Sequence, residues 1–214
     1  MKLVSVNVGL PREVPWNGHT AATAIFKAPV DHPVQLRRLN LDGDRQADLR
    51  VHGGPEKAVY AYPSEHYEFW LLELPRTKLP WGAFGENFTT EGLREDNTYI
   101  GDSFRVGTAT VTVTQPRMPC YKLGIKFGSN DMVKRFLASR RTGLYFSVVE
   151  EGEVRAGDPI EMLAQDENRV SVADITRLYV ADKPDPVLLR GAAELEALPA
   201  NWRDYFRQQL QRAS

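Results

Sequence analysis

The feature that most constrains the fold is a succession of short strand-like runs separated by glycine and proline turns. Residues 3–8 and 110–114 alternate apolar and polar side chains, and a nearly continuous apolar run covers residues 144–149. Alternation with a period of two is typical of a strand with one buried face. Many short strands at close spacing indicate a barrel or a sandwich, not strands and helices alternating around a parallel sheet. The sequence therefore predicts a mainly β (α+β) fold.

Further strands and two peripheral helices are expected between these runs. The other predicted strands cover residues 23–27, 34–39, 58–62, 98–100, 103–106 and 159–163. Residues 9–18 carry proline and glycine and are predicted to be a loop. The first helix begins after Ser64, and its apolar face is expected to consist of Tyr67, Trp70, Leu71 and Leu74. The second is capped by Asn130 or Asp131, and its apolar face is expected to consist of Met132, Val133, Phe136 and Leu137.

The composition changes near residue 165, at the polar run 165–169. Three helical patterns follow it, starting at Ser171, at Pro186 and near Asn201. We therefore predict a β-barrel domain over residues 1–165 and a small C-terminal three-helix subdomain over residues 166–214. The tail is too short to bury a large core of its own, so we expect it to dock on the barrel or on a second subunit, which would give a homodimer.

Charge and cysteine content restrict the class of partner. Lysine and arginine number 27 against 28 aspartates and glutamates, so the net charge of −1 gives no general attraction to nucleic acid or to an acidic membrane. The single cysteine cannot form an internal disulfide, which fits a reducing compartment. No apolar run approaches the ~20 residues of a membrane span, and the N-terminus is too polar for a signal peptide. We expect a cytoplasmic protein that binds neither nucleic acid nor membrane.

The only cysteine, Cys120, lies just beyond a predicted strand. Pro116 and Pro119 end that strand, because proline cannot donate to a sheet ladder and restricts the residue before it. Arg117 and Lys122 flank the thiol, and nearby cations favour the thiolate. A rigid thiolate in this setting is a candidate nucleophile, metal ligand or redox group. The alternative is a buried cysteine that serves only as a small apolar side chain.

Polar groups suited to holding an anion occur in the glycine-bearing stretches before Cys120. They are Arg45, His52, Gly53, Gly54, Lys57 and Asn87. Consecutive glycines let backbone N–H groups come close to a ligand, as they do in phosphate-binding nests. Taken singly, each residue also has a purely structural explanation, such as a solvated turn arginine or an asparagine that holds its own loop. Only convergence on Cys120 would make a site of them.

Several motifs taken together resemble the MOSC domain, the C-terminal domain type of molybdenum cofactor sulfurases. They are DGDRQAD at 42–48, HGG at 52–54, KAVYAY at 57–62, GENF at 85–88, IGD at 100–102 and QPRMPCYK at 115–122. Their order and spacing are similar to the bacterial YiiM-like branch, and the helical tail resembles the three-helix domain of that branch. The resemblance covers essentially the whole chain and implies a MOSC-type β-barrel with peripheral helices.

The resemblance also implies a cofactor and a reaction. It implies that the chain binds the molybdenum cofactor (molybdopterin), with Cys120 as the catalytic residue and the protein ligand to molybdenum. The implied cofactor-binding positions are Arg45, His52, Gly53, Gly54, Lys57, Asn87, Phe88 and Arg117. The implied reaction is the reduction of N-hydroxylated bases such as 6-N-hydroxylaminopurine, or of related N-oxygenated compounds. The alternative is a non-catalytic carrier of the cofactor, or a sulfur-carrier binding module.

Two further points concern the source of electrons and the metal ligand that this reaction would need. The chain has no iron–sulfur or flavin motif, so the electrons for a reduction must come from a separate donor protein. A thiolate is a soft ligand that suits a redox-active transition metal, which agrees with the implied role of Cys120. Pyridoxal phosphate binding is associated with the family as a whole, and no residue of this chain is assigned to it.

Overall fold

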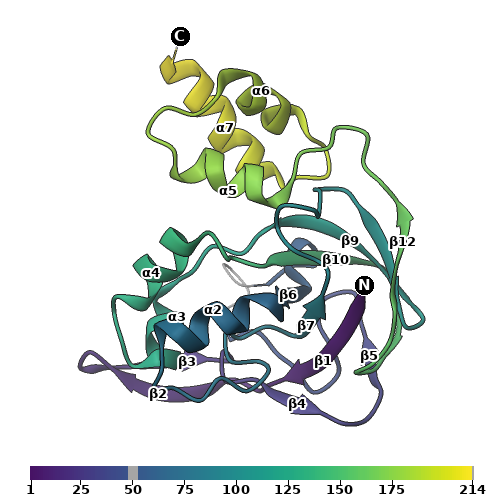
Figure 1. The fold of residues 1–214 in the computed structure, drawn as a ribbon, viewed down its shortest axis with the longest axis vertical. Coiled ribbons are helices and arrows are strands. Elements are labelled where there is room, and N and C mark those ends of the chain that lie inside the picture. The colour runs from purple at the N-terminus through teal and green to yellow at the C-terminus, as the bar shows by residue number, and fades with distance from the viewer. Residues whose placement is uncertain (48–52, 214) are drawn as a thin grey trace.

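The computed structural model describes residues 1–47 and 53–213, and within them a single large sheet dominates (Figure 1). Its eight strands lie in the order β12 (Ile160–Ala164), β8 (Ser103–Val106), β9 (Ala109–Pro116), β10 (Leu144–Glu150), β6 (Val59–Pro63), β7 (Phe88–Glu91), β1 (Lys2–Val8) and β4 (Ala28–Val30). Neighbouring strands run antiparallel except β6 and β7, which are parallel.

The sheet curls until β1 meets the chain that leads into β12. Lys2 and Pro159 form an isolated antiparallel bridge, and the Leu3 N–H donates to the Asp158 carbonyl at 2.9 Å. A short bridge, not a continuous ladder, therefore joins these parts of the sheet. The α+β fold predicted from the alternating runs is confirmed, together with its C-terminal helical region.

Two small two-stranded sheets complete the β structure. β2 (Arg12–Trp16) pairs with β3 (His19–Thr23), and β5 (Val34–Leu36) pairs with β11 (Gly152–Val154). The loop predicted at residues 9–18 is therefore wrong, because most of it forms this β2–β3 hairpin. The turn is Asn17-Gly18, with φ values of 49° and 79°. Asn-Gly is a strong hairpin signal, since both residues tolerate positive φ.

Other strand predictions shift by a few residues. Residues 24–27, expected to be a strand, have no strand structure, and β4 begins at Ala28 instead. The strand expected at 98–100 is absent, and Tyr99 makes only a single bridge to Ser171. β7 was not expected, because it has only four residues and directly follows a stretch that is interrupted by glycines. Short buried strands next to turns give little periodic signal.

Two helices pack near β6, since Tyr60 and Tyr62 share an apolar cluster with residues of both. α2 (Glu65–Glu73) buries Tyr67 and Trp70, as its aromatic stripe predicts. Leu71 is 51% exposed, so its assignment to the buried face was wrong. The helix predicted after Asp131 is α4 (Met132–Ser139), whose Phe136 ring stacks on Trp70 with centroids 5.6 Å apart.

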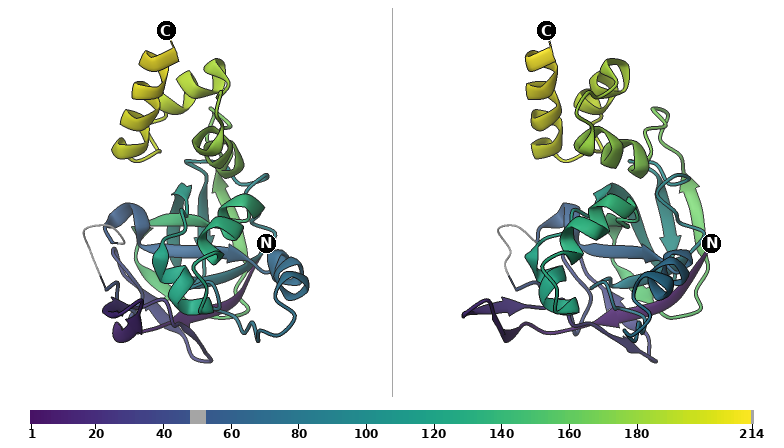
Figure 2. Two further views of the ribbon diagram at one scale, coloured as in Figure 1. Left: turned by 90° about the vertical axis from the view of Figure 1, so that its left-hand side faces the viewer. Right: turned by 60° about the vertical axis from the view of Figure 1, so that its left-hand side comes forward.

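The tail consists of α5 (Val172–Val180), α6 (Pro186–Glu194) and α7 (Ala200–Ala213), which lie together beyond one end of the sheet in every view (Figures 1 and 2). The buried side chains of the tail, such as Ile175 and Phe206, belong to the same apolar cluster as Val113 and Phe146 of the sheet. The tail is therefore docked on the barrel. The division at residue 165 stays a prediction, because one continuous core crosses it.

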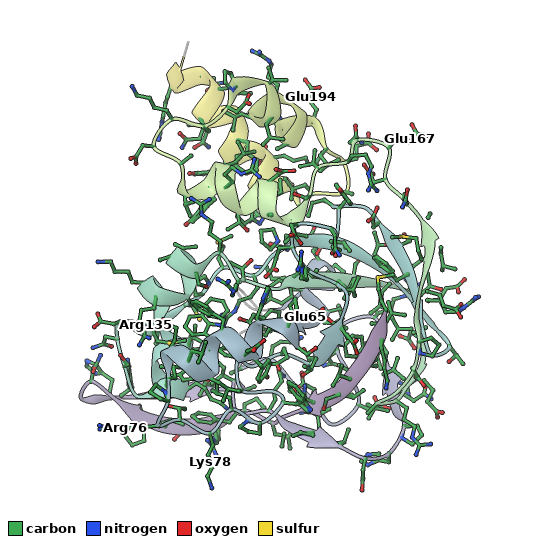
Figure 3. All side chains as sticks on the ribbon, in the orientation of Figure 1. Glu65, Arg76, Lys78, Arg135, Glu167 and Glu194 are labelled. Atoms are coloured by element: carbon green, nitrogen blue, oxygen red, sulfur yellow. The ribbon has the colours of Figure 1, made fainter. Side chains whose placement is uncertain are left out.

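Charged side chains point outward from this core, as Figure 3 shows for Arg76, Lys78 and Glu194. Within residues 1–47 and 53–213, every helix falls short of the length and apolar character needed to cross a bilayer.

We expect Ser171→Ala to lower the free energy of unfolding by about 1 kcal/mol, because Ser171 closes a capping box at the start of α5. Its hydroxyl accepts from the Asp174 N–H at 3.0 Å, and the Asp174 carboxylate accepts from the Ser171 N–H at 3.0 Å. Urea unfolding measures the difference. Ser171→Thr, which keeps the hydroxyl, should lose much less, and equal losses in the two variants would contradict the capping role.

Candidate functional site

A cavity of about 90 Å³, partly open to solvent, brings together residues that are far apart in the chain. Cys120, Arg117, Lys57, Arg45 and Asn87 all line it. Its other described lining residues are Thr23, Ala24, Ile25, Lys27, Asp44, Gln46, Ala47, Tyr60, Gly85, Lys122 and Tyr145. Of the positions singled out in the sequence, Arg45, Lys57, Asn87 and Arg117 therefore share one cavity with Cys120, and their binding of a cofactor stays a prediction.

Cys120 is held between a strand end and a helix start. β9 ends at Pro116, and the Arg117 N–H donates to the Gly143 carbonyl at 3.3 Å. Helix α3 (Tyr121–Phe127), which was not predicted, begins directly after Cys120, whose carbonyl accepts from the Leu123 N–H at 2.9 Å. The side chain is half-buried. It therefore lies at a cavity wall among polar groups and not inside the apolar core.

Arg117 is a buried cation beside this thiol. Its side chain lies over the rings of Tyr60 and Phe136, with the guanidinium carbon 5.2 Å and 5.1 Å from the two centroids. Arg117 is only 6% exposed. Its Nη1 is buried and finds no hydrogen-bond acceptor within the part of the chain that the structure describes. A buried charged donor without an acceptor is costly, so this guanidinium is suited to meeting an anion.

Lys57 approaches the cavity from a short 3-10 helix, Pro55–Lys57. The Glu56 carbonyl accepts from the Thr114 hydroxyl at 2.7 Å and from the Gln115 amide at 3.3 Å, which ties this turn to β9. Burial lowers the pKa of the Lys57 ammonium, and the charge of Glu56 opposes that shift. Together with Arg45, Arg117 and Lys122, Lys57 makes the wall around Cys120 electropositive.

Asn87 connects the strands to the loop around Asp44. Its amide nitrogen donates to Asp44 Oδ2 at 2.9 Å and to the Asn7 carbonyl at 3.3 Å, and its oxygen accepts from the Tyr60 N–H at 3.2 Å. Asp44 in turn forms an ion pair with Lys27. Burial lowers the pKa of Lys27, and the Asp44 carboxylate opposes this. Asn87 thus joins β1, β6 and the loop around Asp44 by hydrogen bonds, and its contact with a cofactor stays a prediction.

Glu86 organises the loop that carries Asn87. Its carboxylate accepts from the Gly82 N–H at 2.8 Å, from the Phe84 N–H at 3.0 Å and from the Thr89 hydroxyl at 3.0 Å. The Tyr67 hydroxyl donates to the same group. Burial raises the pKa of Glu86, and these hydrogen bonds oppose the shift by stabilising the charged form.

We expect Glu86→Ala to lower the free energy of unfolding by about 2 kcal/mol, because it leaves several buried donors without an acceptor. Chemical unfolding of the purified variant measures the loss. Glu86→Gln keeps one oxygen in place and should lose clearly less. If the alanine and glutamine variants unfold at the same denaturant concentration as the original protein, the carboxylate does not organise this loop.

Phe88, Gly53 and Gly54, which were also predicted to bind the cofactor, do not line this cavity. Phe88 is fully buried in β7, where it pairs with Val6 and Ala61 in the apolar core and not at the cavity wall. Gly53 and Gly54 precede the 3-10 helix, and Gly54 has a φ of 100°, but neither is among the lining residues. His52 lies outside the described residues.

Sequence reasoning missed other lining residues, above all Tyr60 and Tyr145. They face each other across β6 and β10, and their ring centroids are 5.4 Å apart. Burial raises the pKa of both phenols, and the charge of Arg117 opposes the shift in each case. Both strands were predicted, so the missing information was the register that sets these two rings side by side.

Comparison with known proteins places this architecture in a family. The MOSC domain model matches residues 48–161, and the model of the YiiM-like 3-alpha helix domain matches residues 170–213. The YflK protein of Bacillus subtilis (strain 168) is 43% identical over 204 residues, covering 95% of this chain and 92% of the relative. The crystal structure of YiiM from Geobacillus stearothermophilus superposes with a TM-score of 0.81 at 34% identity, covering 98% of each chain.

A third relative is named for an activity. It is a protein called "Reductase" from Gibberella moniliformis (strain M3125 / FGSC 7600), 33% identical over 185 residues, or 85% of this chain. The match covers only 32% of the fungal protein. With both family models matched in order along one chain, this protein belongs to the MOSC domain family, which is associated with molybdenum cofactor binding, and carries the YiiM-like 3-alpha helix domain.

Proposed function

We propose that this protein is a molybdenum-cofactor-dependent oxidoreductase that reduces N-hydroxylated bases, such as 6-N-hydroxylaminopurine, or related N-oxygenated compounds. The observation that carries the proposal is the shared cavity of Cys120 and Arg117. A half-buried thiol and a buried guanidinium with an unsatisfied Nη1 line the same wall.

The residues present fit the chemistry of the proposed cofactor. A molybdopterin combines a soft metal–sulfur centre with a phosphate group. A cysteine thiolate is a soft ligand suited to such a metal. The cations Arg45, Lys57, Arg117 and Lys122 of the same wall are suited to the phosphate, because charge-assisted hydrogen bonds to phosphate are among the strongest in proteins. Arg117 also has a buried Nη1 without an acceptor in the described part of the chain, which leaves one donor of this guanidinium unused.

In this proposal Cys120 would bind the metal and the cations would hold the anionic part of the cofactor, while Asn87 and Asp44 keep the wall in place. When bound, the cofactor supplies two-electron redox chemistry. The overall reaction breaks the N–O bond of the substrate. Two electrons and two protons are consumed, and the products are the amine and water. The electrons come from a separate donor protein, since the chain carries no iron–sulfur or flavin motif.

The fungal relative named as a reductase supports an oxidoreductase over a carrier that binds the cofactor without turnover. The test is the molybdenum and pterin content of protein purified from molybdate-fed cells, measured beside turnover of 6-N-hydroxylaminopurine with reduced viologen as electron source. Bound cofactor with turnover supports the proposal. Bound cofactor without turnover of any N-hydroxylated compound overturns the reductase and indicates a carrier, and protein without molybdenum overturns both.

A further inference from the structure

A second cavity lies between the sheet and the helical tail. The sheet side contributes Gln115, Met118 and Tyr145, and the tail contributes Tyr179 of α5 with Trp202 and Tyr205 of α7. We call it the tail pocket. It shares Lys57 and Tyr145 with the cavity of Cys120, so the two spaces meet at a common wall. A molecule in the tail pocket would therefore be a neighbour of the proposed redox centre.

The tail side of this pocket is aromatic. The Tyr179 ring meets Trp202 edge-on, with centroids 5.5 Å apart, and its centroid lies 5.7 Å from that of Tyr205. Tyr179 is 41% exposed, although it adjoins a well-packed tail core. A cluster of rings with a face open to a cavity is suited to stacking on a planar ring, because every heteroaromatic base offers a π-face.

The aromatic cluster is also anchored to the strand that leads to Cys120. The Trp202 indole N–H donates to Gln115 Oε1 at 2.8 Å, and both side chains are buried. The Gln115 amide nitrogen donates to the Glu56 carbonyl at 3.3 Å, next to Lys57. These two hydrogen bonds hold Trp202 of α7 in place relative to Gln115 of β9 and to the turn that carries Lys57, a lining residue of the Cys120 cavity. Rigid support of this kind is what a binding site needs to position a substrate.

We propose that the tail pocket binds the planar heteroaromatic ring of the substrate, so that the three-helix tail selects N-hydroxylated bases over small aliphatic hydroxylamines. The inference rests on the proposed function and adds a binding role for the tail. The ring stacks on Tyr179 and Tyr205, while its N-hydroxyl group reaches past Tyr145 toward the Cys120 cavity. Asn201 and Lys57 also line the pocket, and their polar side chains are suited to the ring nitrogens.

The test uses Tyr179→Ser and Tyr205→Ser, with Tyr179→Phe and Tyr205→Phe as ring-retaining controls. Val187→Ser is a control for the tail surface, because Val187 is 72% exposed on α6 and lies outside the pocket. Two quantities are measured on the cofactor-loaded protein. One is the Kd of adenine by equilibrium dialysis, and the other is the ratio of kcat/KM for 6-N-hydroxylaminopurine to that for N-methylhydroxylamine, a small aliphatic hydroxylamine.

Each serine variant should weaken adenine binding about tenfold, since stacking of a base on an aromatic side chain typically contributes about 1–3 kcal/mol. The kcat/KM ratio should fall by about the same factor. The phenylalanine variants and Val187→Ser should leave both quantities unchanged. Molybdenum and pterin content should stay the same in all of them.

Two outcomes would overturn the assignment of the tail pocket. Unchanged adenine affinity in both serine variants would show that the base binds elsewhere. Loss of pterin with retained adenine affinity would show that the rings hold the cofactor and not the substrate. Failure of the proposed function is distinguished by Cys120→Ser: full turnover in that variant rejects the redox role of the thiol, whatever the tail variants do.

Discussion

Cys120→Ala is expected to remove molybdenum from the protein and to lower turnover of 6-N-hydroxylaminopurine by more than about 100-fold. Replacing a group that merely supports a metal ligand already costs about 10–100-fold, and here the proposed ligand itself is lost. The thiol lines the cavity beside Arg117 and is half-buried, so the change removes few packing contacts. Metal analysis and turnover with reduced viologen, on protein from molybdate-fed cells, measure the two losses.

The matched control for this prediction is Tyr121→Ala. Tyr121 follows Cys120 in the chain, but it is 52% exposed and does not line the cavity. That variant should keep its molybdenum and its turnover. The thermal midpoint of cofactor-free Cys120→Ala should also match that of the cofactor-free original protein. A Cys120→Ala protein that keeps both metal and activity would remove the thiol from the proposed mechanism.

Arg117→Met is expected to change cofactor binding and stability in opposite directions. Hydrogen bonds to charged groups contribute about 1.5–3 kcal/mol, so cofactor affinity should fall at least about tenfold. The same change removes a buried cation whose Nη1 has no acceptor in the described part of the chain. The cofactor-free protein should therefore be as stable as the original or more stable by about 1 kcal/mol, as found when buried charges are replaced by apolar groups.

Pterin and molybdenum content measure the first effect, and urea unfolding of cofactor-free protein measures the second. Arg117→Lys keeps the charge but not the planar fork, so its affinity should fall between those of the original and the methionine variant. Arg105→Met removes an exposed arginine that pairs with Glu161 on the far sheet edge and should change neither quantity. Full cofactor content in Arg117→Met would mean that this guanidinium does not bind the cofactor.

The strands and tail helices were predictable where neighbouring residues in the sequence carry the pattern of a strand or a helix. β1, β8, β9, β10 and β12 follow from alternating or apolar runs, and α6 starts at Pro186 as predicted. Capping residues and helical periodicity act within a few residues of each other, so the sequence displays them directly. The missed β2–β3 hairpin carried a local signal too, in Asn17-Gly18, which the surrounding prolines obscured.

The site was predictable in part. The resemblance to a family pointed to Arg45, Lys57, Asn87, Arg117 and Cys120, which the structure brings to one cavity. It could not tell a residue that faces the cavity from one that supports it from behind. Phe88 follows Asn87 in the same motif. Successive side chains of a strand point to opposite faces, and the side chain of Phe88, the first residue of β7, points into the apolar core.

The sequence by itself determined the α+β class, the helical tail and the membership of the MOSC family, because these depend on short-range patterns and on the order of motifs. Only the tertiary structure decided that Arg117, whose Nη1 lacks an acceptor in the described part of the chain, lines the same cavity as Cys120. It alone also decided that Trp202 of the tail is hydrogen-bonded to Gln115 of the sheet. The physical reason is that such contacts join segments far apart in the chain. Their distances depend on sheet register and on how the tail docks, and no local run of residues specifies either.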